Sequence, residues 1–292
     1  MFDFNRNPDE SFRNEFKNYM KNNYCDILKI VNLSQSLCGR NIEIYQLGNT
    51  KNSVLYVASF HGAEWITSLV IFKFIDEILQ KFEIYKNILS LRGITAIPCI
   101  NPDGVEISLN GYETAKKYRE LVKKNLDKKK PKYWQANARG VDLNHNFNAG
   151  WQDVHKKERE LGIISASNTR YGGEFPESES ESKSLADFCR KNFFEYSFAF
   201  HSQGEEIYWN YGNITPKKSR FMAEIFSALS GYKISEPIGI AVGGGFKDWF
   251  IEIFRRPAFT VEVGKGQNPL NIKEFKGIYK KIKKMLEISI CL

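Results

Sequence analysis

The sequence predicts an α/β protein, a three-layer α/β/α sandwich with helices on both faces of a mixed central sheet. Apolar runs typical of strands alternate along the chain with segments whose apolar residues recur at helical spacing. Some neighbouring strand-like runs are separated only by short turns, which adds hairpin-like pairs to the alternation. The 292 residues contain no internal repeat, low-complexity tract or linker. We therefore expect one domain over residues 1–292, with an N-terminal helical segment of about 1–38 packed on it.

The first hundred residues are expected to form helices, a strand pair, a long helix and a further strand. Helical spacing of apolar residues predicts one or two helices over 8–35. Period-two alternation predicts a strand over 41–47, and a turn then leads into a buried strand over 54–60, so that the two form an antiparallel pair. Helical spacing resumes over about 64–82, and a strand follows at about 91–98.

The middle of the chain, about 105–176, is expected to be mostly irregular apart from a helix at 113–126. It follows the segment 98–104, which we interpret as a break in regular structure. So long a loop-rich stretch in a compact domain usually carries function rather than packing.

Regular elements return after residue 176. The expected helices are 177–191, 216–229, 246–254 and a last one that Asn268-Pro269 opens and that ends near 288, and the expected strands are 195–201, 205–209 and 258–263. A glycine-rich loop, 239–245, precedes the short helix. In open sheets of this kind, ligands bind beyond the carboxyl ends of the strands.

Composition and charge exclude several classes of protein. No apolar run is long enough to span a membrane and no signal peptide is visible, so we expect no membrane association and a cytoplasmic location. The five scattered cysteines favour neither a disulfide framework nor a cysteine zinc site. The net charge of +8 is concentrated in the lysine-rich segment 123–132, which lacks interleaved aromatic residues, so we expect a solvated surface and no nucleic-acid partner.

Four side chains near strand ends could carry chemistry. His61 and Glu64 lie three residues apart where a strand gives way to a helix, and His201 closes the apolar run 196–200. Each alone also fits a surface or capping role, but together they would form a three-ligand Zn²⁺ site with a position open for water. Glu262 lies in an otherwise buried strand, where an acid is costly unless it has a partner or a task. It would be free to act as the base for that water.

The order of these residues resembles that of the zinc carboxypeptidase family from about residue 40 to 265. His61, Glu64 and His201 match its zinc ligands, and Glu262 matches its catalytic glutamate. The accessory motifs that also match are Asn101–Gly104, Gly140–Asn144, Tyr171–Gly173 and Asp248-Trp249. The resemblance implies a metallopeptidase with one Zn²⁺ per chain, and it implies that Asp142 orients His61.

Three departures from the family pattern bear on the substrate. His145 replaces the arginine that grips a terminal carboxylate together with Asn144, Ile240 lies near the position of the tyrosine that closes over substrate, and Ala63 replaces a further arginine. The chain is therefore not expected to be a digestive-type carboxypeptidase. The segments Val141–Phe147, His201–Trp209 and Gly244–Phe250 resemble instead the bacterial γ-D-glutamyl-meso-diaminopimelate peptidases.

The resemblance implies a mechanism in which Glu262 takes a proton from a zinc-activated water and passes it to the leaving amine. A cation would stabilise the oxyanion: Arg139 is the candidate because it precedes the Gly140–Asn144 motif, Arg119 is the alternative, and a surface ion pair is an equal interpretation of Arg139.

Asn144 and His145 are expected to contact a substrate carboxylate. Glu205 and Glu206 either meet an ammonium group of diaminopimelate or are surface acids.

The sequence thus predicts hydrolysis of the γ-D-glutamyl-meso-diaminopimelate bond in peptidoglycan stem peptides or muropeptides. Hydrolysis of other peptides or acyl-amino acids is the first alternative. A non-catalytic binding relative is the second, and the intact set of His61, Glu64, His201 and Glu262 argues against it.

Overall fold

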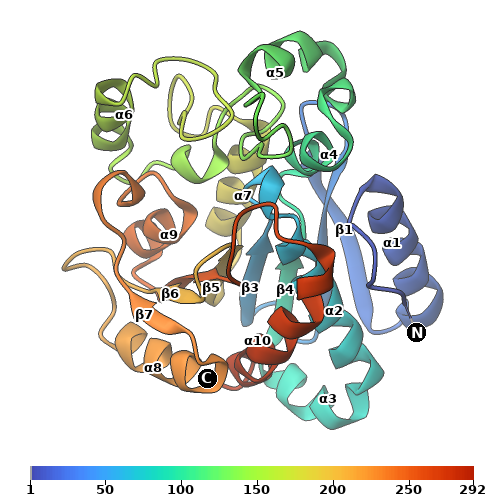
Figure 1. Cartoon of the computed structure of the whole chain (residues 1–292). Helices are drawn as coiled ribbons and strands as arrows, with labels where there is room; N and C mark the ends of the chain where they lie inside the picture. Colours follow the sequence, from blue (N-terminus) through green and yellow to red (C-terminus); the bar gives the residue numbers. More distant parts are fainter. Residues whose placement is uncertain (1) are drawn as a thin grey trace.

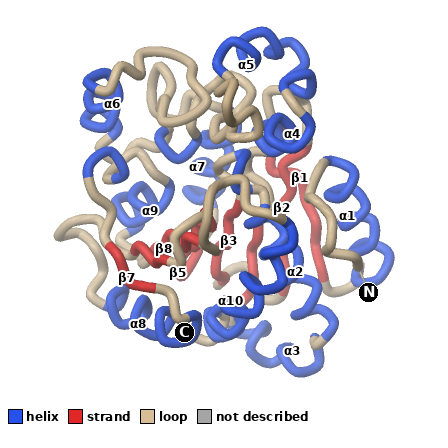
Figure 2. The backbone as a smooth tube through the Cα atoms, viewed as in Figure 1, coloured by secondary structure: helices blue, strands red, loops and turns tan. Residues whose placement is uncertain are grey.

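A computed structural model describes residues 2–292 and shows one mixed eight-stranded sheet between two layers of helices, as predicted (Figure 1). The strands are β1 (Leu28–Gln35), β2 (Asn41–Leu47), β3 (Ser53–Ala58), β4 (Gly93–Ile97), β5 (Phe194–His201), β6 (Glu206–Tyr208), β7 (Lys233–Ser235) and β8 (Ala258–Glu262). Their order in the sheet is β1-β2-β4-β3-β5-β8-β6-β7. Figure 2 shows the strands in red, with helices in blue around them. The four central strands, β4, β3, β5 and β8, run parallel, so their carboxyl ends meet at one edge.

The helices divide between the two faces of the sheet. They are α1 (Glu10–Tyr24), α2 (Ile66–Gln80), α3 (Phe82–Leu91), α4 (Pro102–Asn110), α5 (Arg119–Asn125), α6 (Trp151–Glu160), α7 (Ser180–Lys191), α8 (Lys218–Ser230), α9 (Phe246–Phe254) and α10 (Phe275–Ser289). Apolar residues of α1, α2, α8 and α10 share one core with the sheet, and those of α7 and α9 share the other. The segment with α4, α5 and α6 lies beyond the carboxyl ends of the central strands (Figure 1).

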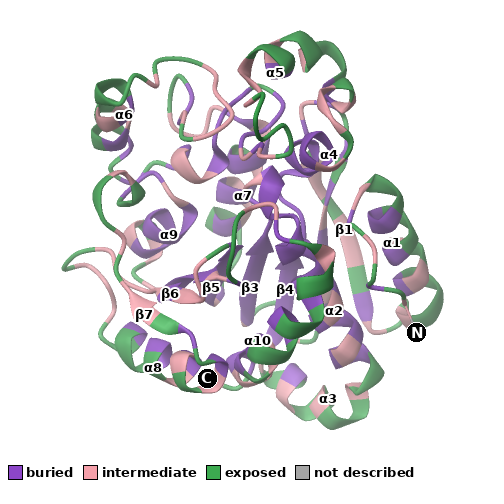
Figure 3. Cartoon of the chain, in the orientation of Figure 1, coloured by how far each residue is buried: buried purple, intermediate pink, exposed green. Residues whose placement is uncertain are grey.

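Strand β3 shows how the sequence creates the two cores. Successive side chains of a strand point to opposite faces, so Val54 and Tyr56 enter the core with α2, while Leu55 and Val57 enter the core with α7 and α9. All six residues of β3 are buried, and the central strands are buried as a group (Figure 3). This double burial explains why the sequence of β3 is almost continuously apolar.

The prediction of helices over 8–35 is wrong in its second half. The expectation that about 1–38 is a helical segment is wrong for the same reason. Helix α1 ends at Tyr24, and residues 28–35 form the edge strand β1, antiparallel to β2. The apolar residues of this segment are Leu28, Ile30, Val31 and Leu33, and this spacing, with Ile30 and Val31 adjacent, fits a strand no worse than a helix.

The predicted antiparallel pair of 41–47 with 54–60 is also wrong. Strand β2 pairs with β1 and β4, whereas β3 lies between the parallel strands β4 and β5. The turn that follows β2 begins at Gly48, which has a positive φ and lies so close to the Leu89 carbonyl that a Cβ would be 2.4 Å from its oxygen. The turn therefore packs on the end of α3 instead of closing a hairpin.

The end of the segment 98–104 opens a helix, contrary to the interpretation that the whole segment breaks regular structure. Asn101 accepts a hydrogen bond from Gly104 N at 2.9 Å as the N-cap of α4, and Pro102 occupies the first turn, where its missing N–H costs nothing. The short helix α6 also lies inside the stretch expected to be irregular. The last helix, α10, begins at Phe275 after a turn capped by Asn271, later than the predicted start at Asn268-Pro269.

Within residues 2–292, no helix has both the length and the apolar character that crossing a membrane requires.

Candidate active site

Two neighbouring parallel strands deliver the three predicted metal ligands. His61 follows the end of β3, Glu64 lies in the short turn that leads into α2, and His201 is the last residue of β5. Because β3 and β5 pair in parallel, with Ala58 opposite Phe200, both strands end at the same edge of the sheet. The topology alone therefore brings the residues 140 positions apart into one site.

The turn between His61 and Glu64 is shaped by close backbone contact. Gly62 and Ala63 donate backbone hydrogen bonds to the carbonyls of Gln135 and Trp134, at 3.1 and 2.8 Å. A Cβ at Gly62 would lie 2.1 Å from the carbonyl oxygen of Gly104. Only glycine fits at position 62. The close packing of Gly62 therefore fixes the directions in which the side chains of His61 and Glu64 project.

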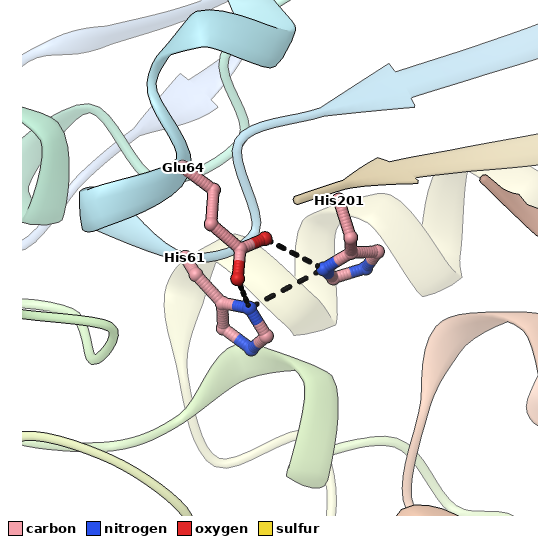
Figure 4. Close-up of side chains that lie close together, drawn as sticks. All are labelled: His61, Glu64 and His201. Atoms are coloured by element: carbon pink, nitrogen blue, oxygen red, sulfur yellow. Dashed lines mark hydrogen bonds and ion pairs between the residues drawn. The ribbon is translucent and has the colours of Figure 1, made fainter. Parts of the chain in front are cut away.

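The donor atoms of the three residues converge (Figure 4). His61 Nδ1 lies 2.9 Å from Glu64 Oε1, His201 Nδ1 lies 3.0 Å from Glu64 Oε2, and the two Nδ1 atoms are 3.3 Å apart. Around a tetrahedral zinc with bonds of about 2.0 Å, neighbouring donors lie about 3.3 Å apart. Among residues 2–292, these three residues are the cluster whose side chains could hold a metal ion. The distances between their donor atoms and the donor types fit Zn²⁺.

Asp142 holds the His61 ring in the orientation that metal binding needs. His61 Nε2 bonds to Asp142 Oδ1 at 3.0 Å, so Nδ1, which faces Glu64, is the nitrogen that would bind the metal once it gives up its proton. Asp142 also accepts hydrogen bonds from the backbone N–H groups of Asn144 and Arg170. Burial alone would raise the pKa of Asp142, but the charge of His61 and these hydrogen bonds hold the pKa well below its usual range.

His201 is oriented by packing instead. Its ring stacks on Phe60 with centroids 5.3 Å apart, and its Nε2 is buried without a hydrogen-bond partner among residues 2–292. With Nδ1 turned toward Glu64, this ring presents the same nitrogen to the site as His61 does.

Glu64 is ionised at neutral pH, as a metal ligand must be. Burial opposes ionisation, but the charge of His61 and hydrogen bonds from both histidines lower the pKa of Glu64 to about 2. Its carboxylate also accepts hydrogen bonds from the Ser202 backbone at 3.2 Å and from Asn268 Nδ2 at 3.4 Å.

Glu262 lies beside the ligands with a very different environment. It ends β8 directly opposite His201 on β5, and its carboxylate makes no hydrogen bond to any residue of the described chain. Burial first, and then the negative charge of Glu64, raise the pKa of Glu262 well above its usual range. A carboxyl group of raised pKa next to a metal site suits proton transfer.

The three ligands and Glu262 line a cavity of about 400 Å³. The two predicted substrate contacts, Asn144 and His145, line it as well. Asn144 Oδ1 accepts a hydrogen bond from Phe246 N at 3.1 Å, so the NH₂ group of Asn144 is the part left for a ligand. His145 Nδ1 hydrogen-bonds to the buried Glu158 at 2.8 Å. Glu158 therefore fixes the imidazole at the position where the family pattern has an arginine.

Four of the predicted charged residues do not line this cavity. Arg139 donates to Glu179 at 2.5 Å, and Arg119 is exposed beside Glu120. Glu205 pairs with Lys281 and Lys265, and Glu206 accepts a hydrogen bond from the Tyr208 hydroxyl. Arg139 therefore makes an ion pair outside this cavity, as the second interpretation expected, but its partner Glu179 is buried instead of lying at the surface.

The cavity is also lined by residues that sequence reasoning missed, among them Tyr133, Gln135, Arg170, Tyr208 and Asn268. Gln135 and Arg170 lie in the long connection at 105–176, where no periodicity marks a functional position. Their nearness to the Gly140–Asn144 and Tyr171–Gly173 motifs was the only available signal.

Comparison with known proteins identifies the family of the chain. A model of the zinc carboxypeptidase family matches residues 14–287. The γ-D-glutamyl-L-diamino acid endopeptidase 1 of Lysinibacillus sphaericus is 36% identical over 260 residues, which cover 85% of this chain and 63% of that protein. The chain thus spans less than two thirds of that relative's length.

Solved structures share the fold at low sequence identity. Bovine thrombin-activatable fibrinolysis inhibitor, in complex with tick carboxypeptidase inhibitor, superposes with a TM-score of 0.78 at 19% identity over 98% of this chain and 96% of its own. Murein-tripeptide amidase MpaA from Escherichia coli O157 gives 0.54 at 19% identity, over 89% and 97%. The family match covers nearly the whole chain, and the ligands of its motif meet in space, so this chain belongs to the zinc carboxypeptidase family, a family of zinc metallopeptidases.

Proposed function

We propose that the chain hydrolyses the γ-D-glutamyl-meso-diaminopimelate bond of peptidoglycan-derived stem peptides. The proposal rests mainly on one observation. His61, Glu64 and His201 form a site suited to zinc in one cavity with Glu262, and the arginine that grips a terminal carboxylate in the family pattern is replaced. His145 stands there instead, already bonded to Glu158. The relative from Lysinibacillus sphaericus, whose name specifies a γ-D-glutamyl-L-diamino acid bond, supports this substrate.

Glu262 has the position and the environment of the proton carrier. When bound, zinc supplies a positive charge that polarises a carbonyl group and makes water more acidic. Glu262 takes the proton from the attacking water as the new C–O bond forms, and it gives the proton to the diaminopimelate nitrogen as the C–N bond breaks. The raised pKa of Glu262 favours the protonated state that the second half of this cycle requires.

Gln135 takes the role of oxyanion donor that the sequence assigned to Arg139. Its Nε2 lies 3.3 Å from Glu64 Oε1, at the metal ligands, and its Oε1 is held by the Thr169 hydroxyl. This hydrogen bond fixes which end of the amide faces the site. A preorganised neutral amide is an effective donor to a developing oxyanion in a water-poor cavity.

A choice of substrates tests the proposal. The protein is incubated with L-Ala-γ-D-Glu-meso-diaminopimelate and, separately, with a hippuryl-type peptide, each with zinc and with a chelator. We expect zinc-dependent cleavage of the tripeptide and little cleavage of the hippuryl peptide. Cleavage of the hippuryl peptide alone would contradict the assigned substrate, and activity that a chelator leaves intact would contradict the zinc mechanism.

A further inference from the structure

Most of the net charge of the chain lies in one short segment. Residues 112–132, which we call the basic segment, contain nine lysine and arginine residues and three acids, a net charge of +6, while the whole chain carries +8. The basic segment comprises a short helical turn, α5 and the loop after α5. It lies beyond the carboxyl ends of the central strands, on the side of the molecule that carries the metal ligands (Figure 1).

The positive charges of the basic segment are exposed and largely without carboxylate partners. All nine of its basic residues are exposed. Within residues 2–292, only Arg119 lies at ion-pair distance from a carboxylate, that of Glu120 at 3.4 Å. Helix α10 is also rich in lysine, but there Lys281 and Lys283 each pair with a glutamate. So many unpaired charges in one place favour a binding surface over the merely solvated surface that the sequence predicts.

The backbone that carries these charges is firmly held. Ala115 and Val122 are fully buried in a small core that also contains Trp134. The Trp134 carbonyl accepts a hydrogen bond at 2.8 Å from Ala63, inside the metal-binding turn, and Tyr133 lines the metal cavity. The basic segment is therefore anchored to the same backbone that shapes the active site.

These charges suit phosphate groups rather than nucleic-acid bases. Eight of the nine are lysines, whose ammonium group binds phosphate as a point charge, whereas arginine is preferred for planar, bidentate contacts. Binding of single-stranded nucleic acid also requires aromatic rings on which bases stack. Tyr112 and Tyr118 pack against the small core, and the ammonium groups of Lys123 and Lys117 lie 5.4 and 5.1 Å from their ring centroids. These two rings are therefore poorly placed to stack on a base.

We propose that the basic segment binds a linear phosphodiester polymer that carries no bases. Such a polymer repeats a single negative charge along a flexible chain, so it can engage several lysines at once and release its condensed counterions. The inference goes beyond the proposed function and does not depend on it, because the basic segment lies outside the lining of the metal cavity. A polymer bound there would hold the protein, with its active site, next to the material that carries the polymer.

The first test compares three polyanions with equal numbers of charges: poly(glycerol phosphate), poly(dT) and poly-L-glutamate. Fluorescence anisotropy of the labelled polymers gives the Kd for the unaltered protein between about 50 and 200 mM salt. We expect poly(glycerol phosphate) to bind most tightly. Its binding constant should fall with salt at a logarithmic slope of about −3 to −4, which corresponds to about five contacted phosphates. Tighter binding of poly(dT) would overturn the inference in favour of a nucleic-acid site, and equal binding of poly-L-glutamate would overturn the preference for phosphate.

Two fourfold variants locate the binding surface. The first removes four exposed charges of the basic segment, by Lys124→Gln, Lys128→Gln, Lys129→Gln and Lys130→Gln. The control removes four exposed charges that are scattered over other elements, by Lys21→Gln, Lys29→Gln, Lys51→Gln and Lys191→Gln. Both variants lower the net charge equally. At about 50 mM salt we expect the first to weaken binding of poly(glycerol phosphate) by at least about 30-fold, and the control by less than about threefold.

Equal weakening by the two variants would show that only the net charge matters, and it would overturn the inference. Hydrolysis of the free tripeptide is an independent measurement, and we expect both variants to keep the kcat/KM of the unaltered protein. The two proposals can fail separately. Polymer binding by a protein that does not cleave the tripeptide supports the surface and contradicts the proposed function, whereas cleavage without polymer binding overturns the surface alone.

Discussion

At the scale of single residues, two carboxylates within one cavity have opposite electrostatic environments. Glu64 faces two histidines, which lower its pKa to about 2, whereas Glu262 faces Glu64, which together with burial raises its pKa. These opposite environments are the ones we expect if Glu64 is the ligand that stays ionised and Glu262 is the carboxyl group that exchanges a proton. The assignment of roles follows from these neighbours rather than from residue type.

Glu262→Gln should retain one zinc per chain and lose turnover by several orders of magnitude, since the amide keeps the shape of the side chain but cannot carry the proton. Metal analysis and kcat on the tripeptide measure the two quantities. Activity close to that of the unaltered protein would remove Glu262 from the mechanism. Loss of zinc together with activity would instead assign it to the metal ligands.

Gln135→Ala should lower kcat by about 10²- to 10³-fold and change KM little, because an oxyanion donor acts mainly in the transition state. Gln203→Ala removes another amide of the same cavity that has no hydrogen bond to Glu64, and we expect less than a threefold change there. Equal effects of the two substitutions on kcat would contradict a specific role of Gln135.

At the scale of elements, one buried amide joins three segments that carry the site. Asn101 caps α4, and its Nδ2 donates to the carbonyls of Phe60, Ala136 and Gln135 at 2.9, 3.1 and 3.3 Å. Phe60 precedes the ligand His61. The side chain thus ties the end of β3 to the loop of Gln135 and to the start of α4.

Asn101→Asp should destabilise the protein by about 2–4 kcal/mol, because a carboxylate can still cap α4 but cannot donate to the three carbonyls, which would face a buried negative charge. Denaturant unfolding measures the change. Asn110→Asp, at the exposed end of the same helix, is the control, and we expect less than about 1 kcal/mol there. A similar small effect at both positions would contradict the role assigned to Asn101.

Helix α7 begins with a buried acid whose ionisation opposes folding. Burial first, and then the charge of Asp103, raise the pKa of Glu181 from 4.5 to about 7, and its Oε1 has no hydrogen-bond partner within residues 2–292. Below pH 4.5 the carboxyl is protonated in the folded and the unfolded chain, so it makes no difference to stability. As the pH rises toward 7 the unfolded chain ionises first, and stability falls.

Glu181→Gln should therefore raise the free energy of unfolding at pH 8 by an amount of the order of 3 kcal/mol and leave it nearly unchanged at pH 4.5. Urea unfolding at the two pH values measures this, with the exposed Glu174→Gln as control. The same difference at both pH values would show that the effect of the substitution is packing rather than ionisation.

At the scale of the whole molecule, the sequence predicted the parts in which one pattern dominates. Strands β3, β5 and β8 are buried on both faces, so their apolar runs and the polar residues at their ends were visible, and the metal ligands with them. Helix α9 was predicted with its observed bounds, 246–254. In these elements local pattern and tertiary environment agree.

Where the prediction failed, tertiary contacts decided between local alternatives. Strand β1 is an edge strand with many partly exposed residues, and the spacing of its few apolar residues also fits a helix. The partner of β2 depends on where the chain packs after Gly48, which no local pattern reveals. Likewise, Arg139 and Gln135 lie four residues apart in one loop, and only the folded backbone determines which of them faces the metal ligands.

The central claim is that this zinc site cleaves the amide bond between γ-D-glutamate and meso-diaminopimelate. Hydrolysis of L-Ala-γ-D-Glu-meso-diaminopimelate in oxygen-18 water, followed by mass spectrometry, tests it most directly. We predict two products, L-Ala-D-Glu with one labelled oxygen in its γ-carboxylate and unlabelled meso-diaminopimelate, formed with zinc and not after its removal by a chelator. Label in the alanine carboxylate, or an intact tripeptide in the presence of the zinc-loaded protein, would contradict the claim.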